Sequence, residues 1–267
     1  MRVNSNTILG QRCRGLRGLG VEWDARWRRK AERSSFSLAG SLAGSSMQEK
    51  TIVRDYFNSV GFERWRRIYG EEEVNFVQKD IRLGHARTVE TVLQWLGDPS
   101  GLRICDAGCG VGSLSLPLAA RGAQVFASDI SEQMVNEARR RQQMELGSTD
   151  NPHFWVSDLE ELTGEYDVVI CLDVMIHYPE AEALRMLKHL TRLARSRLIF
   201  SFAPKTPWLT LLKKVGEFFP GPSKTTRAYQ HREATLVSQL TEWGWKVQQR
   251  QTIRSRFYFA WLLDLVR

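Results

Sequence analysis

The fold class of this 267-residue chain is decided by the stretch Ile104-Cys105-Asp106-Ala107-Gly108-Cys109-Gly110-Val111-Gly112-Ser113-Leu114-Ser115. A short apolar run ends in an acid and enters the pattern Gly-x-Gly-x-Gly, which leads into a predicted helix. Glycines at such a turn let the backbone bend sharply and let a ligand approach without a Cβ in the way. Two interpretations fit the pattern alone: a ligand-binding loop, or a tight strand–helix turn that binds nothing.

The glycine spacing and the flanking acids narrow the class of ligand. Dinucleotide-binding loops use Gly-x-Gly-x-x-Gly, and phosphate loops continue into Gly-Lys-Ser/Thr, which is missing here. Asp106 would repel a pyrophosphate but suits a cationic ligand. A second acid, Asp129, ends the next predicted strand 23 residues later, where a carboxylate can hold a ribose diol.

This combination of motifs resembles the S-adenosylmethionine-dependent methyltransferases that are built on a Rossmann-like sheet. The resemblance implies that the first acid opens the first motif, the three glycines line the methionine end, and the second acid takes the ribose hydroxyls. It also implies an adenine contact after the third strand and a backbone site for the amino-acid end after the fourth. The cofactor-binding residues expected on this basis are Asp106, Gly108, Gly110, Gly112, Asp129, Ile130, Asp158, Leu159, Cys171 and Leu172.

Strand and helix patterns alternate on both sides of the glycine loop, and they predict an α/β fold. Apolar strands are expected at 102–106, 124–128, 153–157, 166–172 and 197–202, with helices at 132–146, 182–193 and 232–243. A β-α-β-α rhythm is typical of a parallel sheet covered on both faces. Two β-like runs at 246–253 and 257–266 predict a C-terminal antiparallel hairpin. We therefore expect a doubly wound, Rossmann-like sheet of about seven strands.

Composition changes along the chain suggest three segments. Residues 1–46 form a basic leader rich in Arg and Ser, expected to be disordered, and three interpretations of it remain open: a transit peptide, a start codon placed too early, or a functional arm. Residues 47–97 have helical periodicity and form an N-terminal arm or cap. Residues 98–267 form the methyltransferase domain, with an amphipathic insertion near 204–230 that we expect to act as a substrate lid.

The charge distribution argues against a nucleic-acid partner. The formal net charge is +8, but residues 1–46 hold nine basic and three acidic side chains, which leaves only +2 for residues 47–267. A nucleic-acid-binding face should give the folded part a clear basic excess. No run approaches the roughly 18 apolar residues of a spanning helix. The four cysteines include no Cys-x-x-Cys pair, so we expect no protein-bound metal.

Segments outside the cofactor motifs resemble the magnesium-protoporphyrin IX methyltransferases of chlorophyll synthesis. They lie at 55–70, 80–85, 173–179, 201–206 and 219–224. The resemblance implies methyl transfer from S-adenosylmethionine to one propionate of magnesium protoporphyrin IX, giving the 13-monomethyl ester, with the magnesium arriving inside the porphyrin. It further implies contact with the magnesium chelatase. The expected location is the cytoplasm or the surface of the photosynthetic (thylakoid) membrane, or the chloroplast if the leader is a transit peptide.

Within this family Tyr69 and His177 match the positions credited with a catalytic role. For both residues a purely structural role stays open. Tyr69, for example, could simply pack the arm over the cofactor. Two other functions also remain open. One is a regulator that binds tetrapyrrole or S-adenosylmethionine without turnover, and the other is a methyltransferase for a quinone or another small carboxylate.

Overall fold

The computed structural model describes residues 47–267 except 71, 149 and 207–227. The leader at 1–46 and most of the expected lid at 204–230 therefore lie outside the described residues. Residues Glu49–Arg267 form one compact unit.

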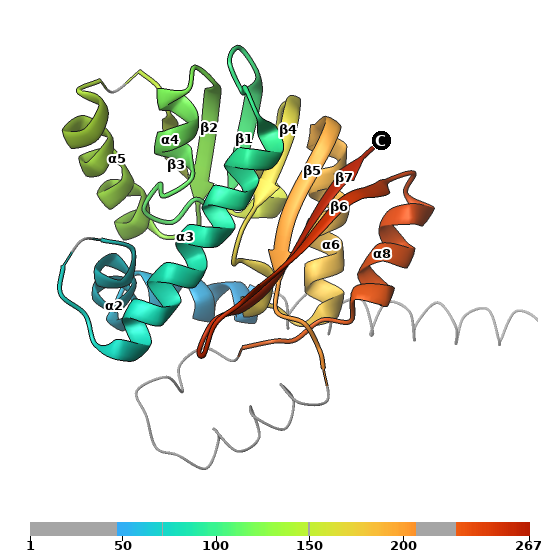
Figure 1. Cartoon of the computed structure of the whole chain (residues 1–267), viewed down its shortest axis with the longest axis horizontal. Coiled ribbons are helices and arrows are strands. Elements are labelled where there is room, and N and C mark those ends of the chain that lie inside the picture. Colours follow the sequence, from blue (N-terminus) through green and yellow to red (C-terminus); the bar gives the residue numbers. More distant parts are fainter. Residues whose placement is uncertain (1–46, 71, 149, 207–227) are drawn as a thin grey trace, which may run out of the picture. The chain divides into compact units, whose positions relative to one another are not determined.

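The centre of this unit is a seven-stranded sheet with the spatial order β3-β2-β1-β4-β5-β7-β6 (Figure 1). The first five strands run parallel to one another, and β7 runs antiparallel to both β5 and β6. The predicted sheet and its C-terminal hairpin are thereby confirmed. The strands are β1 (Arg103–Ala107), β2 (Gln124–Asp129), β3 (His153–Val156), β4 (Tyr166–Cys171), β5 (Ala194–Phe202), β6 (Lys246–Arg254) and β7 (Phe259–Val266).

Helices cover both faces of the sheet, as its doubly wound character requires (Figure 1). Residues 49–57 are also helical and precede the first named helix. The named elements are α2 (Val60–Tyr69), α3 (Phe76–Leu96), α4 (Ser115–Ala120), α5 (Glu132–Leu146), α6 (Glu180–Leu193), α8 (Glu233–Glu242) and the short 3₁₀ turns η1 (Leu159–Glu161) and η2 (Met175–His177).

Local sequence signals explain where the helices begin and end. In α3, Asn75 and Gln78 form a reciprocal capping box that satisfies otherwise unpaired backbone amides. In α5, the Ser131 hydroxyl caps the first turn and Gly147 ends the helix in the left-handed conformation. Helix α6 starts at Glu180, two residues before the predicted start, and Pro179 is its N-cap residue.

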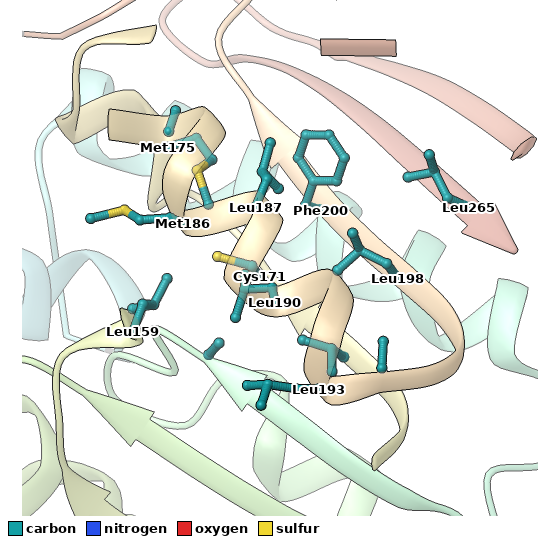
Figure 2. Close-up of a cluster of buried hydrophobic side chains, with 14 of the residues drawn as sticks. Leu159, Cys171, Met175, Met186, Leu187, Leu190, Leu193, Leu198, Phe200 and Leu265 are labelled. Carbon is teal, nitrogen blue, oxygen red and sulfur yellow. The ribbon is translucent and has the colours of Figure 1, made fainter. Parts of the chain in front are cut away.

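Two apolar clusters hold the helices against the sheet. On one face, α4 and α5 pack over β2 and β3 and α3 packs over β6 and β7, with Val92, Leu116 and Val135 among the buried side chains. On the other face, α6 and α8 contribute to the second cluster, part of which Figure 2 shows. There Met186, Leu187, Leu190 and Leu193 of α6 meet Leu198 and Phe200 of β5 and Leu265 of β7. The two clusters fix the strand ends that carry the candidate site.

Candidate functional site

The candidate site is a cavity at the carboxyl ends of β1 and β4, which lie side by side in the sheet. In open α/β sheets this is the position where the strand order reverses and where ligands bind. Its walls come from the helical arm, the loops after β1, β2 and β4, and the β6–β7 hairpin. The lining residues used below are Tyr56, Phe57, Trp65, Tyr69, His85, Gly108, Gly110, Asp129, Ile130, Leu159, Leu172, Asp173, His177, Phe257 and Tyr258.

The loop after β1 is tied to the end of the neighbouring strand β2. The backbone amides of Gly108 and Cys109 donate to the carbonyl of Ser128 at 2.8 and 2.9 Å. Gly108 has φ +85°, and a Cβ there would lie 2.2 Å from Cγ2 of Val174 in the loop after β4. Only glycine therefore lets the loops after β1 and β4 approach this closely.

Asp129 presents its carboxylate to the cavity from the end of β2. Its Oδ2 accepts from the amide of Gly110 at 3.0 Å, and its Oδ1 accepts from the amide of Ser131 at 2.9 Å. Burial raises the pKa of Asp129, although these backbone donors act in the opposite direction. Each oxygen keeps a lone pair, so the carboxylate can accept hydroxyl groups of a ligand.

Four of the residues expected from the resemblance are absent from the cavity lining: Asp106, Gly112, Asp158 and Cys171. Asp106 is buried and accepts a hydrogen bond from the Ser115 hydroxyl at 2.5 Å. Burial raises the pKa of Asp106 to about 6. A Cβ on Gly112 would come within 3.1 Å of Phe154, so this glycine serves the packing of α4 and α5.

The remaining two also have structural partners. Asp158 caps η1 through the amide of Glu160 at 2.9 Å and forms an ion pair with Lys50 at 2.7 Å. The Cys171 side chain lies in the core cluster on the α6 face. Leu159 and Leu172, which directly follow Asp158 and Cys171 in the chain, do line the cavity.

Tyr69 and His177 both reach the cavity, from α2 and η2 respectively. Burial raises the pKa of Tyr69 well above its ordinary value, so its hydroxyl stays protonated. Burial lowers the pKa of His177 to about 4, so its ring is neutral at neutral pH. Phe57 packs edge-on against His177 with ring centroids 5.1 Å apart. Within the described residues, Nδ1 of His177 is buried without a hydrogen-bond partner.

Sequence reasoning assigned no role to a polar cluster around Asp173, which follows β4. Asp173 Oδ2 lies 2.9 Å from Nδ1 of His85, and its Oδ1 accepts from the Ser201 hydroxyl at 3.0 Å. The Tyr258 hydroxyl donates to the same carboxylate at 2.9 Å. Asp173 adopts φ +56°, a left-handed conformation that aspartate tolerates better than most residues. The segments at 80–85 and 173–179 carried the family resemblance, which was the available signal.

The described part of the chain, which omits 1–46, 71, 149 and 207–227, holds no group of three His, Cys, Asp or Glu side chains arranged to bind a metal. Cys105, Cys109 and Cys171 are free and buried, and burial raises the pKa of each thiol. Nor does any helix in these ranges have the length and apolar character needed to cross a bilayer.

Two protein-family models and several curated proteins match this chain. A family model described as Magnesium-protoporphyrin IX methyltransferase C-terminus matches residues 171–267, and one described as Methyltransferase domain matches residues 104–197. The magnesium-protoporphyrin O-methyltransferase of Synechocystis sp. is 56% identical over 229 residues, which is 85% of this chain and 100% of that protein.

A plant protein and a crystal structure extend the comparison. The chloroplastic magnesium protoporphyrin IX methyltransferase of Arabidopsis thaliana is 55% identical over 82% of this chain and 71% of its own length. The crystal structure of magnesium protoporphyrin IX methyltransferase from Synechocystis with bound SAH superposes with a TM-score of 0.77 at 56% identity, covering 82% of this chain and 99% of that one. The chain therefore belongs to the magnesium-protoporphyrin IX methyltransferases, which are S-adenosylmethionine-dependent enzymes.

Proposed function

We propose that this protein transfers a methyl group from S-adenosylmethionine to the 13-propionate of magnesium protoporphyrin IX, giving the monomethyl ester. The observation that carries the proposal is a single cavity that combines the glycine loop after β1, the Asp129 carboxylate and the side chains of Tyr69 and His177. This combination supplies a cofactor subsite and a reaction subsite within one space, in a chain whose relatives are named for this substrate.

The residues at the strand ends fit S-adenosylmethionine. Gly110 lines the cavity, and a Cβ there would have nothing within 4 Å, so a ligand can approach the backbone on that side. Asp129 offers a carboxylate for a diol, and Asp173 adds a second negative charge that favours a cationic ligand. S-adenosylmethionine supplies the electrophilic methyl group when bound. We propose that Gly108, Gly110, Asp129, Ile130, Leu159 and Leu172 hold it, with Asp106, Gly112, Asp158 and Cys171 shaping the wall behind them.

The chemistry places modest demands on the protein. A propionate has a pKa of about 4–5 if it behaves like a glutamate side chain, so it is already an anion at neutral pH. No general base is required, and the protein must instead align the carboxylate and exclude water. Tyr56, Phe57, Trp65 and Tyr69 provide an aromatic wall from the arm that can do both. Alignment of this kind can lower a barrier by roughly 7–11 kcal/mol.

Tyr69 and His177 are suited to orient the carboxylate. Because the Tyr69 hydroxyl stays protonated and the His177 ring stays neutral, each can contribute a hydrogen bond without taking a proton from the substrate. Replacing either side chain should therefore slow turnover without abolishing it. We propose no protein-bound metal in this step.

The direct test is to mix the purified protein with magnesium protoporphyrin IX and S-adenosylmethionine and to follow the porphyrin by mass spectrometry. A gain of one methylene per porphyrin is expected, and NMR of the product should place the ester on the 13-propionate. Tight porphyrin binding without product would favour a regulator. Failure to bind the porphyrin would contradict the proposed substrate. It would favour a methyltransferase that acts on a quinone or another small carboxylate.

We further propose that the protein receives its substrate from the magnesium chelatase at the surface of a photosynthetic membrane. The support is an exposed aromatic pair, Phe76 and Phe257, whose ring centroids lie 5.8 Å apart, with the Arg256 guanidinium 5.4 Å from the Phe76 ring centroid. Aromatic rings with an adjacent cation suit a membrane interface. Because the Arabidopsis relative is named chloroplastic, a chloroplast location follows if residues 1–46 act as a transit peptide. Co-sedimentation with anionic vesicles, weakened in a Phe76→Ser, Phe257→Ser variant, tests the membrane contact.

A further inference from the structure

The hydrogen bonds around Asp173 fix one ring nitrogen of His85. Burial alone would raise the pKa of Asp173, but the hydrogen bonds from His85, Tyr258 and Ser201 hold it below its ordinary value. The carboxylate is therefore ionised and can only accept hydrogen bonds. Nδ1 of His85, 2.9 Å from Oδ2, must carry the proton between them.

The other ring nitrogen of His85 has no protein partner. Among the described residues, Nε2 is buried and makes no hydrogen bond, although the ring lines the cavity. Tyr69, which we place at the reaction subsite, faces the His85 ring with centroids 4.3 Å apart. A buried nitrogen without a partner is costly, and at a binding site the partner is expected to be a ligand.

We propose that His85 binds the carboxylate of the substrate through Nε2 and that Asp173 is its positioning residue. The inference rests on the proposed function and assigns the group that holds the reacting propionate. In the proposed complex each ring nitrogen carries a proton, so that Nδ1 donates to Asp173 and Nε2 donates to the substrate carboxylate. One substrate oxygen accepts the hydrogen bond from Nε2, and the other stays available for the methyl group.

The surroundings of Asp173 give this arrangement its rigidity. The amide of Asp173 donates to the Ser201 hydroxyl at 2.7 Å, and the same hydroxyl donates back to the carboxylate. Thr88 lies 2.9 Å from the Tyr258 hydroxyl, which anchors the other side of the cluster to α3. An imidazole whose far nitrogen is held by a fixed carboxylate keeps both its tautomer and its direction.

The test compares binding of magnesium protoporphyrin IX with binding of its dimethyl ester, which lacks both carboxylates, in the presence of S-adenosylhomocysteine. Loss of a charge-assisted hydrogen bond in His85→Ala should weaken binding of the acid by about 10- to 100-fold. Binding of the ester and of S-adenosylhomocysteine should not change. His85→Gln, which keeps a donor near the position of Nε2, should recover part of the preference for the acid. His153→Ala is the matched control, because His153 is exposed on β3 and does not line the cavity.

Asp173→Asn tests the positioning role, and it should raise KM for the porphyrin more than it lowers kcat. Equal weakening of acid and ester in His85→Ala, or no weakening of either, would overturn the inference, as would loss of S-adenosylhomocysteine binding in both His85 variants. Methylation by the wild-type protein is measured in parallel. Normal methylation without the acid preference overturns this inference alone, whereas no methylation by the wild type overturns the proposed function.

Discussion

At the scale of single residues, the site depends on side chains that burial holds in one protonation state. His177 is kept neutral and Tyr69 is kept protonated, while the hydrogen bonds around Asp173 keep that carboxylate charged. Tyr69 and His177 are therefore neutral groups beside a fixed negative charge. In the proposed reaction the nucleophile is already an anion, so we expect these two side chains to orient the carboxylate without proton transfer.

The burial of His177 predicts a pH-dependent contribution to stability. Because its pKa falls from 6.5 to about 4 on folding, the unfolded chain binds more protons between these values. Stability should therefore fall as the pH drops through this window, by on the order of 1–3 kcal/mol. His177→Gln should lose less stability than the wild type between pH 6.5 and 4, as measured by urea unfolding. The raised pKa of Asp106 changes stability in the opposite direction over the same pH range. Its contribution is present in both proteins and therefore cancels when their stabilities are compared. Parallel curves for the two proteins would contradict the prediction.

Gly108→Ala should damage both stability and cofactor binding. The new Cβ meets Val174 at 2.2 Å and the residue sits at φ +85°, so steric overlap adds to backbone strain. We expect a loss of about 2–4 kcal/mol in the free energy of unfolding and weak S-adenosylhomocysteine binding. Gly147→Ala is the matched control, because φ is +63° there and nothing lies within 4 Å of its Cβ. Equal losses at the two positions would show that the contact with Val174 is unimportant.

At the scale of elements, a buried ion pair joins the parallel and antiparallel parts of the sheet. Arg197 on β5 donates from Nε and Nη2 to the two oxygens of Asp264 on β7, both at 2.8 Å. Gln249 on β6 donates to the same carboxylate at 3.2 Å, and Arg197 also donates to the carbonyl of Trp95 at the end of α3. The Arg197–Asp264 pair thus links three strands and one helix.

Asp264→Asn should therefore destabilise the protein strongly. It leaves the Arg197 guanidinium half-paired beside the fully buried position 264, and breaking a buried pair typically costs about 3–5 kcal/mol. The double variant Arg197→Met, Asp264→Leu should recover most of that loss, because no buried charge remains. Urea unfolding checks both. As a control, Glu165→Gln breaks the exposed pair with Arg195 and should have little effect. A double variant as unstable as the single one would contradict this account.

Periodicity was sufficient to predict the elements because their signals are local. Strand β4 consists almost entirely of apolar residues, and the glycine loop carries its pattern in consecutive positions. The polar cluster around Asp173 could not be predicted in the same way. His85 lies on α3, and Tyr258 stands at the turn before β7, so only the folded sheet brings them to Asp173. Periodicity can also predict too much burial. Val77 fits the apolar period of α3 and yet is 36% exposed.

At the scale of the whole molecule, the sheet topology concentrates the chemistry at one edge. The loops after β1 and β4 meet there because these two strands are neighbours in the sheet, although their paired residues Asp106 and Ile170 are 64 positions apart in the chain. The arm closes one side of the cavity and the β6–β7 hairpin another. Residues that are remote in sequence therefore form the site, while both apolar clusters lie beneath it.

The basic leader at residues 1–46 is expected to be dispensable for catalysis but to strengthen membrane binding. Among the described residues, the core clusters and the cavity lining fall between Val53 and Leu265. We therefore expect that removing residues 1–46 leaves the melting temperature and kcat/KM for methylation unchanged. The leader carries a net charge of +6, against +2 for residues 47–267, so its removal should weaken binding to anionic vesicles at low salt. Calorimetry, the methylation assay and vesicle co-sedimentation measure the three quantities. A loss of kcat/KM on truncation would instead show that the leader is a functional arm. Binding of its charges to a membrane surface cannot change catalysis when no membrane is present.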